Sequence, residues 1–338
     1  MASEIPLISV IMPMYNVEKY IAEALKSVLS QDMENIEVIV VDDCSTDKSC
    51  EIVESFMPQF NGRLKLLHTK SNRGCAGPPR NKGLEFSRGK YIYFMDSDDV
   101  IAVGTLQNFY NVAENFKADV LMGKNYIISS GVGEKFLKET AFVGNPNDNT
   151  LKSLSENMPM RIKLWSENYF EVVPWLKFLR RDFLVENEIK FLPIMQEDSY
   201  WTFELICLAK TIIILPNAFY VSRRYPNSLS TKALNANFNF EGIYNKLDRI
   251  INGLKHVDEF MGGIKFFQKN PQYRHAVIHN ITMQNVGWLM RAYGNIPQFQ
   301  IYEKFKEVLK KDTGDFDVLI SCLISASMHL ISNLPQQK

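Results

Sequence analysis

Three aspartates follow one short apolar run in this chain of 338 residues. The run YIYFM ends at Met95, and Asp96, Asp98 and Asp99 come directly after it. Carboxylates at a strand end repel one another unless a cation or hydrogen-bond donors compensate their charge, and hard oxygen ligands of this kind suit Mg²⁺ or Mn²⁺. The spacing therefore predicts a divalent-metal site. The structural alternative is a helix N-cap with a solvated acidic turn.

A second acidic group follows another apolar run, in the segment VIVVDDCSTD. Asp42 and Asp43 end this run, and Ser45, Thr46 and Asp47 come after them. Paired carboxylates at a neighbouring strand end can accept hydrogen bonds from a nucleobase or ribose, or join the metal site. The alternative is a turn that caps the next helix. We expect that role for Asp47, and it stays open for Asp42.

A loop rich in glycine and basic side chains lies between these two groups, with the sequence SNRGCAGPPRNKG. Its glycines let the backbone approach a ligand closely, while Arg73, Arg80 and Lys82 supply positive charge. Diphosphate is the natural ligand of such a combination. The loop is a weak signal by itself, because many loops of this composition bind nothing.

The elements that must position these residues are short apolar runs that alternate with helical patterns. We expect strands at 7–13, 36–41, 64–67 and 91–95, and helices near 21–29, 52–56, 80–87 and 105–116. Such alternation predicts an α/β fold with a doubly wound, mostly parallel sheet and helices on both faces. Ligands of these sheets bind at the carboxyl ends of the strands, where all three polar groups fall.

The later part of the chain is less regular. Residues 129–160 are rich in Gly, Asn, Ser and Thr and predict a long irregular excursion. Helices are then expected over 178–186 and 197–209, with a strand at 211–215. From about residue 235 four helical patterns follow without a convincing strand, which predicts a C-terminal helical segment.

Composition and charge exclude several classes of protein. The chain has 46 % hydrophobic and 22 % charged residues, and its 38 Lys+Arg balance its 38 Asp+Glu. This is a globular composition, and no overall field indicates nucleic-acid binding. Five scattered cysteines without a C-x-x-C pair, and an N-terminus without a secretory pattern, predict a cytoplasmic protein. No segment has the ~20 apolar residues of a membrane-spanning helix.

Taken together, the motifs resemble the family-2 glycosyltransferases, enzymes with the GT-A fold that use nucleotide-sugar donors. The resemblance is carried by VIMPMYN, IEVIVVDDCSTD and NRGCAGPPRNKGLEFSRGKYIYFMDSDD, in the family's order and spacing. It covers residues 6–125 and, more loosely, 170–231. The resemblance implies an inverting transfer of a sugar from a nucleotide-sugar, first of all a UDP-sugar, to a hydroxyl of a glycan or lipid-linked oligosaccharide in surface polysaccharide biosynthesis.

The resemblance also assigns residues to the donor. In the family, the first strand end, the aspartate pair and the glycine-rich loop bind the nucleotide-sugar, which here implies Pro13, Tyr15, Asn16, Asp42, Asp43, Asn72, Gly74, Arg80, Asn81 and Asp96. Asp96-Ser97-Asp98 matches the family's D-x-D motif. Its last aspartate is usually the direct ligand of Mn²⁺ or Mg²⁺, and its first contacts ribose or metal.

Two later segments, VVPWLKFLRRDFL and IKFLPIMQEDSYW, resemble the family's W-x-K-L segment and its downstream Glu-Asp pair. They imply Asp198 as the catalytic base, with Glu197 and Trp175 in supporting or acceptor-side roles. A partial match to the family's arginine-rich segment adds Arg224 to the acceptor side. For Glu197 and Asp198 the structural alternative is favourable charge at a helix N-terminus.

The implied chemistry agrees with the residue types. Displacing a nucleoside diphosphate from an anomeric carbon concentrates negative charge on the leaving group, which a cation at Asp98 stabilises. A carboxylate on the opposite side must take the proton of the acceptor hydroxyl. In-line attack then inverts the anomeric centre, so an α-linked donor gives a β-linkage.

Three other functions remain open. The run from Asp96 to Val100 fits the D-x-D-x-[TV] motif of haloacid-dehalogenase-type phosphatases, although Asp42 and Asp43 precede it in the wrong order. The segment IVVDD suggests a receiver-like signalling module, which leaves most of the chain unexplained. A catalytically inactive sugar-binding homologue would carry the same motifs.

We therefore divide the chain into a nucleotide-sugar-binding half (1–125), an acceptor-side half with the catalytic base (126–234) and a helical C-terminal extension (235–338). Three roles are open for the extension: it shapes the acceptor site, forms a homo-oligomer, or lies peripherally on the inner face of a membrane that holds lipid-linked acceptors.

Overall fold

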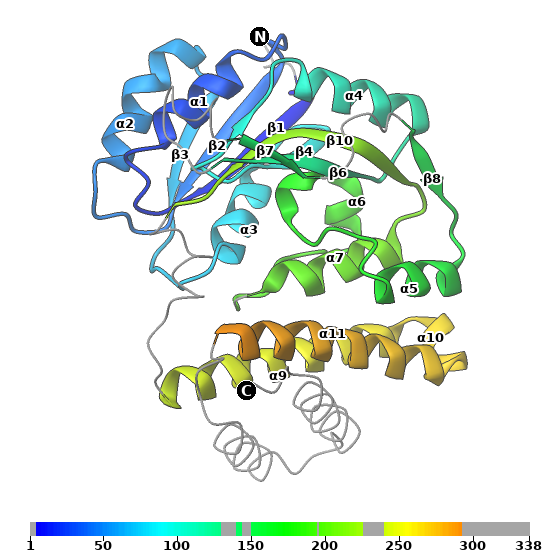
Figure 1. Cartoon of the computed structure of the whole chain (residues 1–338). Coiled ribbons are helices and arrows are strands. Elements are labelled where there is room, and N and C mark those ends of the chain that lie inside the picture. The colour runs from blue at the N-terminus through cyan, green and yellow to red at the C-terminus, as the bar shows by residue number, and fades with distance from the viewer. Residues whose placement is uncertain (1–4, 130–139, 144–149, 195, 226–239, 293–338) are drawn as a thin grey trace. The chain divides into compact units, whose positions relative to one another are not determined.

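The computed structural model describes residues 5–129, 140–143, 150–194, 196–225 and 240–292 (Figure 1). The chain divides into two compact units. The first comprises Met1–Asn157 with Asn168–Tyr225, and the second comprises Met158–Glu167 with Pro226–Lys338. The predicted boundaries at residues 125 and 234 stay predictions.

The first unit is an α/β structure. Its strands are β1 (Ile8–Met14), β2 (Ile36–Asp42), β3 (Leu64–His68), β4 (Tyr91–Phe94), β5 (Val100–Ile101), β6 (Val120–Ser129), β7 (Thr140–Val143), β8 (Lys152–Leu154), β9 (Lys177–Arg180) and β10 (Ile212–Arg223). Its helices are α1 (Ile21–Leu29), α2 (Ser49–Phe56), α3 (Gly77–Phe86), α4 (Thr105–Phe116), α6 (Arg181–Glu186) and α7 (Glu197–Leu208), with short 3-10 helices at Met57–Phe60 and Pro174–Leu176.

The strands form one mixed sheet, whose main path has the order β3-β2-β1-β4-β9-β6-β10-β5. The first four strands run parallel, so their carboxyl ends meet at one edge. Strand β9 runs antiparallel to both of its neighbours, β4 and β6. The predicted α/β class with helices on both faces is confirmed, and β9 together with the short antiparallel strands makes the sheet mixed.

Helices cover both faces of this sheet: α1, α2 and α4 lie on one face, and α3, α6 and α7 lie on the other (Figure 1). Helix α1 buries Ile21, Leu25 and Val28, whose spacing is that of one helical face. Helix α3 packs closely, because a Cβ atom at Gly83 would collide with the side chain of Ile11 in β1. This close approach fixes the position of α3 over the parallel strands.

Some sequence predictions are wrong. The sequence predicts one helix over 178–186, but Lys177–Arg180 form strand β9 and the helix begins at Arg181. Pairing of β9 with strands on both sides outweighs its local helical spacing. The predicted irregular excursion over 129–160 contains β7, β8 and the start of α5. Strand β6 is absent from the predicted elements.

The second unit is helical where it is described, as predicted for the C-terminal segment. Its helices are α5 (Met158–Ser166), α9 (Phe240–Gly263), α10 (Lys265–Lys269) and α11 (Pro271–Ala292). Arg274 of α11 forms a bidentate ion pair with Asp258 of α9, with N–O distances of 2.6 and 2.7 Å. The fourth predicted helical pattern lies outside the described residues. Within the described part of the chain, every helix is too short or too polar to cross a membrane.

Candidate functional site

The predicted polar groups lie at the carboxyl ends of neighbouring parallel strands. Strand β1 pairs in parallel with β2 on one side and with β4 on the other. The loops that follow these three strands therefore leave the sheet at one edge. The structure thus brings together the first strand end, the aspartate pair and the acidic group, as the topology of a parallel sheet predicts.

The loop after β1 is tied to the loop after β2. Asn16 Oδ1 accepts a hydrogen bond from Thr46 N (2.7 Å), and Asn16 N donates one to Ser45 Oγ (3.0 Å). Asn16 has a φ of 51°, a left-handed conformation that asparagine adopts more readily than most residues. Beside it, Tyr15 is 44 % exposed and Pro13 is half-buried, so both are accessible to a ligand at this edge.

Asp42 and Asp43 are both buried and are held by different loops. The Asp42 carboxylate accepts hydrogen bonds from Ser45 N (3.1 and 3.3 Å), and its Oδ2 lies 3.2 Å from His68 Nδ1. Asp43 Oδ1 accepts a hydrogen bond from Thr69 Oγ1 (2.6 Å). The contact between Asp42 and Ser45 is the turn that the sequence left open, so Asp42 has a structural role as well. A nucleotide contact by either aspartate stays a prediction.

The glycine-rich loop places its two asparagines differently. Asn72 is exposed and its Oδ1 accepts a hydrogen bond from Gly74 N (2.6 Å), in a turn where Gly74 has a φ of 69°. A side chain at that position would be strained. In contrast, the Asn81 amide bonds the backbone of Phe191 through both of its groups, at 2.7 and 2.9 Å. Asn81 therefore joins α3 to the segment before α7.

The acidic group after β4 gathers three carboxylates. Oxygen atoms of Asp96, Asp98 and Asp99 lie within 4.8 Å of one another. Burial, and then the charge of Asp96, raises the pKa of Asp98 to about 6, and burial with the two neighbouring carboxylates raises the pKa of Asp99 above its ordinary value. Both shifts arise first from burial and then from repulsion between the neighbouring carboxylates. A hard divalent cation fits this all-oxygen donor set.

The C-terminal end of strand β10 supports the acidic group, and the sequence did not reveal this contact. Tyr220 donates its hydroxyl to Asp99 Oδ2 (2.7 Å), and Arg223 N donates to Asp99 Oδ1 (2.6 Å). Tyr225 donates its hydroxyl to Asp98 Oδ2 (2.9 Å). Asp99 is thus fixed by two donors from another strand and supports the loop, whereas Asp98 accepts a hydrogen bond from the Tyr225 hydroxyl.

The two predicted acceptor-side residues, Trp175 and Arg224, differ in how exposed their side chains are. Trp175 is 7 % exposed and stacks on Tyr220, with ring centroids 4.2 Å apart and planes 10° from parallel. It therefore supports the tyrosine that holds Asp99. Arg224 has an exposed side chain, and its backbone N donates to Ser129 O (2.7 Å). An acceptor contact by either residue stays a prediction.

Arg80 joins two parts of the chain that are far apart in sequence. Its Nη2 lies 2.9 Å from Asp96 Oδ1, while its Nη1 lies 3.2 Å from Glu197 Oε1 and 3.2 Å from Asp198 Oδ1. The guanidinium is buried and lies 5.3 Å from the ring centroid of Phe191. The sequence predicted Arg80 near the diphosphate. Here it contacts three carboxylates, so it connects the acidic group with the start of α7.

The two carboxylates at the start of α7, Glu197 and Asp198, share one cation, the guanidinium of Arg80. Burial and then Asp198 raise the pKa of Glu197 to about 8, although Arg80 lowers it. Burial also raises the pKa of Asp198, which Arg80 lowers and Asp96 raises. Because Glu197 is buried beside Asp198 and its pKa is about 8, it keeps its proton near neutral pH. Asp198 has 26 % of its side chain exposed, so solvent or an acceptor can reach it.

Removing the guanidinium should destabilise the fold. We expect Arg80→Met to lower the free energy of unfolding by about 3 kcal/mol, because three carboxylates lose the buried charge that compensates them. The measurement is urea unfolding at pH 7, with Arg73→Met as the matched control, since Arg73 is exposed in the preceding loop. Equal stability of the two variants would show that the ion pairs do not support the fold.

The proton on Glu197 predicts a pH dependence of stability. Its pKa is about 8 in the folded chain against an ordinary 4.5. Between these two pH values the folded state binds more protons than the unfolded state, so the free energy of unfolding falls as pH rises. We expect Glu197→Gln to flatten the decrease in Tm between pH 5 and pH 8, because glutamine stays neutral. The measurement is thermal unfolding in metal-free buffer, with the exposed Glu186→Gln as control. An unchanged pH profile contradicts the assignment.

A buried lysine near this cluster was missed. Lys177 is fully buried, and its Nζ donates hydrogen bonds to the carbonyl oxygens of Glu171 (2.7 Å) and Val173 (2.9 Å). Burial lowers its pKa to about 7, and Asp198 is the strongest charge that opposes this decrease. Lys177 therefore belongs electrostatically to the Asp198 group. The available signal was a lysine inside the apolar run WLKFL.

The chain is similar in sequence to known proteins. The sequence profile described as Glycosyl transferase family 2 matches residues 9–186. Glycosyltransferase GlyG of Streptococcus pneumoniae is 32 % identical over 227 residues, which cover 66 % of this chain and 72 % of GlyG. The poly(ribitol-phosphate) beta-N-acetylglucosaminyltransferase TarS of Staphylococcus aureus is 33 % identical over 230 residues, which cover 66 % of this chain but only 37 % of TarS.

A solved structure shares the fold. The crystal structure of S. aureus TarS 1-349 in complex with UDP-GlcNAc aligns with 98 % of this chain and 93 % of its own, with a TM-score of 0.58 and 23 % identity. The family profile covers more than half of the chain, and it includes the strand ends, the glycine-rich loop and the acidic group. The resemblance inferred from the motifs is therefore confirmed, and the chain belongs to glycosyl transferase family 2.

Proposed function

We propose that this protein transfers a sugar, with inversion, from a UDP-sugar to a hydroxyl of a glycan or lipid-linked oligosaccharide in surface polysaccharide biosynthesis. The observation that carries the proposal is the bridge made by Arg80, which bonds Asp96 of the acidic group and Asp198 of α7. The bridge puts the candidate metal side and the candidate base in one site. A single displacement requires a metal and a base in the same site, because the charge on the leaving diphosphate must be stabilised while the proton of the acceptor hydroxyl is removed.

The names of the relatives support the donor and acceptor classes. TarS is named as a beta-N-acetylglucosaminyltransferase of poly(ribitol-phosphate), and a Bacillus spizizenii relative, 30 % identical over 258 residues, as the corresponding beta-glucosyltransferase. TarS has been crystallised with UDP and with UDP-GlcNAc. Inversion at an α-linked donor gives the β-linkage that these names print. A UDP-sugar and a polyhydroxyl surface polymer are therefore the first candidates here.

The nucleotide-sugar is assigned to the carboxyl-end edge of the parallel strands. The assignment comprises Pro13, Tyr15, Asn16, Asp42, Asp43, Asn72, Gly74, Arg80 and Asp96. Tyr15 supports it because an exposed aromatic ring at this edge offers a face for a base. The buried carboxylates of Asp42 and Asp43 supply acceptors for base and ribose donors.

Asp98 and Asp96 are the residues that would hold Mn²⁺ or Mg²⁺. When bound, such a cation stabilises the charge that develops on the departing diphosphate. The protein's own residues prepare this place: Tyr220 and Arg223 N fix Asp99, and Arg80 orients Asp96.

Asp198 is assigned as the base that takes the proton of the acceptor hydroxyl. Its carboxylate is half-buried at the N-terminal end of α7 and is oriented by Arg80. Glu197 shares Arg80 and keeps its proton near neutral pH, so it adds no negative charge beside Asp198. Trp175 and Arg224 remain the acceptor-side candidates, one through packing and one through an exposed cation.

The proposal involves no nucleic acid. A cytoplasmic location, membrane contact and oligomer formation through the C-terminal helices are predictions.

Calorimetry tests the donor class. Titration of the chain with UDP, GDP and dTDP in the presence of Mn²⁺ should give the tightest binding for UDP, and EDTA should weaken that binding. Tighter binding of GDP or dTDP contradicts the UDP assignment. Lack of binding by any of the three contradicts the proposed donor site.

The family membership weakens the alternatives. A phosphatase nucleophile motif normally follows the first strand, but here Asp96 follows β4 and its backbone N donates to the hydroxyl of Tyr220 (3.2 Å). A receiver module does not account for α7 or for the Arg80 bridge. The inactive sugar-binding homologue is separated from an enzyme by turnover alone.

A further inference from the structure

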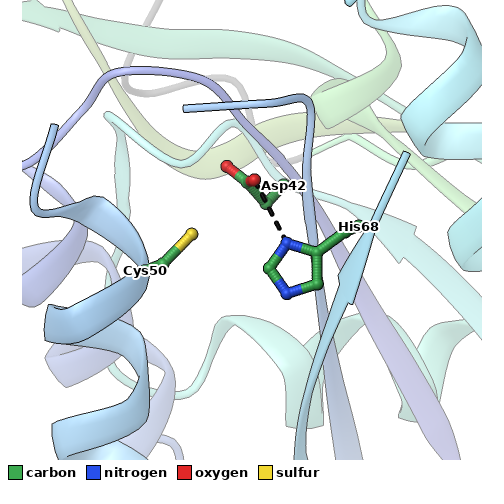
Figure 2. A group of neighbouring side chains, drawn as sticks. All are labelled: Asp42, Cys50 and His68. Carbon is green, nitrogen blue, oxygen red and sulfur yellow. Dashed lines mark hydrogen bonds and ion pairs between the residues drawn. The ribbon is translucent and has the colours of Figure 1, made fainter. Parts of the chain in front are cut away.

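A second group of potential metal ligands lies away from the three aspartates. Figure 2 shows Asp42 from the end of β2, Cys50 from the first turn of α2 and His68 from the end of β3, pointing toward one another. One ligand atom from each of these side chains lies within 4.8 Å of the other two. The proposed glycosyl transfer gives no role to Cys50 or His68.

The donor set differs from that of the acidic group. It combines a thiol, an imidazole and a carboxylate, which are the ligands that Zn²⁺ and similar thiophilic cations take in proteins. A hard cation such as Mg²⁺ prefers oxygen alone. The two groups therefore select different metals. A thiolate from Cys50 and the carboxylate of Asp42 together balance the charge of one divalent ion.

The geometry is close to that of a bound ion. Ligands of Zn²⁺ lie about 2.0–2.3 Å from the metal, so tetrahedral neighbours are roughly 3.3–3.8 Å apart. Asp42 Oδ2 and His68 Nδ1 are already 3.2 Å apart. The carboxylate is oriented by Ser45 N, which is the kind of outer contact that fixes metal ligands. The His68 side chain is 58 % exposed, so it can rotate inward and leaves a path for the ion.

Binding would require loss of one proton. Burial and the Asp42 carboxylate raise the pKa of the Cys50 thiol to about 11, so the resting thiol is protonated. On binding, the sulfur–hydrogen bond is replaced by a sulfur–metal bond and the proton passes to solvent. No oxidant or reductant takes part.

We propose that Asp42, Cys50 and His68 form an inhibitory site for a thiophilic divalent cation of the Zn²⁺ type. The ion binds the carboxylate of Asp42, which the nucleotide would otherwise contact. The cation and the nucleobase therefore exclude each other. This exclusion rests on the proposed function, whereas binding of the cation by the three side chains does not.

Cobalt is the probe for the site itself. The full chain is titrated with Co²⁺ in excess Mg²⁺, which saturates the all-oxygen group, and the cobalt–thiolate charge-transfer absorption is recorded. We expect one equivalent of Co²⁺ to produce this band. Cys50→Ser should abolish it and His68→Gln should weaken binding at least tenfold, a minimum set by the ~10–100-fold losses seen when even outer contacts of a metal site are removed.

Cys44 provides the matched control, because it is an exposed thiol in the adjacent loop. Cys44→Ser should retain the band. Absence of the band in the unmodified chain, its survival in Cys50→Ser, or its loss in Cys44→Ser would each overturn the cation site. Circular dichroism confirms that each variant is folded.

Competition with uridine separates this proposal from the proposed function. Uridine is used because it lacks the phosphates that chelate cobalt. It should raise the apparent Kd for Co²⁺, and Zn²⁺ should inhibit sugar-nucleotide turnover of the unmodified chain more strongly than that of Cys50→Ser. A cobalt band that uridine does not affect would leave the cation site in place and refute both its inhibitory role and the nucleotide role of Asp42.

Discussion

Replacing Asp198 with asparagine is expected to lower the rate of sugar transfer by about 10²–10⁴-fold, the usual contribution of a positioned general base. Asparagine has nearly the same shape and keeps an oxygen that can accept the hydrogen bond from Arg80. It cannot take a proton from an acceptor hydroxyl at neutral pH. The donor contacts assigned to β1, β2 and the acidic group are unchanged, so the affinity for UDP should change little.

The measurement combines single-turnover transfer with calorimetric binding of UDP. Asp182→Asn is the matched control, because Asp182 has 70 % of its side chain exposed on α6 and its ion pair with Arg181 is long, at 3.9 Å. That variant should transfer sugar normally. If Asp198→Asn loses UDP affinity in proportion to its rate, Asp198 contributes to donor binding and the assignment of the base is wrong.

Replacing Asp98 with asparagine is expected to remove the metal-dependent part of turnover, a loss of about a thousandfold if the cation contributes several kcal/mol to leaving-group stabilisation. Asp98 accepts a hydrogen bond from the Tyr225 hydroxyl, whereas Asp99 is fixed by two donors of β10. The substitution removes one negative charge and keeps the side-chain volume. It should therefore weaken Mn²⁺ binding without unfolding the loop.

Mn²⁺ binding measured by electron paramagnetic resonance, followed by turnover with and without EDTA, checks this expectation. Asp32→Asn is the control, because Asp32 is exposed in the turn after α1. The Asp98 variant should lose both Mn²⁺ affinity and the response to EDTA. Unchanged Mn²⁺ affinity in that variant would move the metal away from Asp98.

The strand ends were predictable from sequence because local signals and topology agree there. The run YIYFM is apolar throughout and IEVIVV is apolar apart from Glu37, and buried parallel strands need such runs. Once the strands are parallel neighbours, Asp42 and Asp96 must emerge at the same edge. The family resemblance added roles that no spacing rule gives, above all for Asp198.

The remaining features depend on contacts between distant segments. Strand β9 has helical spacing in its sequence and becomes a strand only because β4 and β6 flank it. Arg80 and Asp198 are 118 positions apart, and nothing local in either segment indicates that they pair. The hydroxyl groups of Tyr220 and Tyr225 reach the acidic group only because β10 lies beside it in the fold.

Release of free nucleoside diphosphate from a panel of UDP-, GDP- and dTDP-sugars tests the proposed sugar transfer most directly. The reaction is run with Mn²⁺ or Mg²⁺ and then with EDTA, with and without a polyhydroxyl acceptor such as poly(ribitol-phosphate). We expect release from a UDP-sugar that requires the metal and is accelerated by a suitable acceptor. Calorimetric binding of UDP without any release across the panel would contradict it and identify a sugar-nucleotide-binding protein without transferase activity.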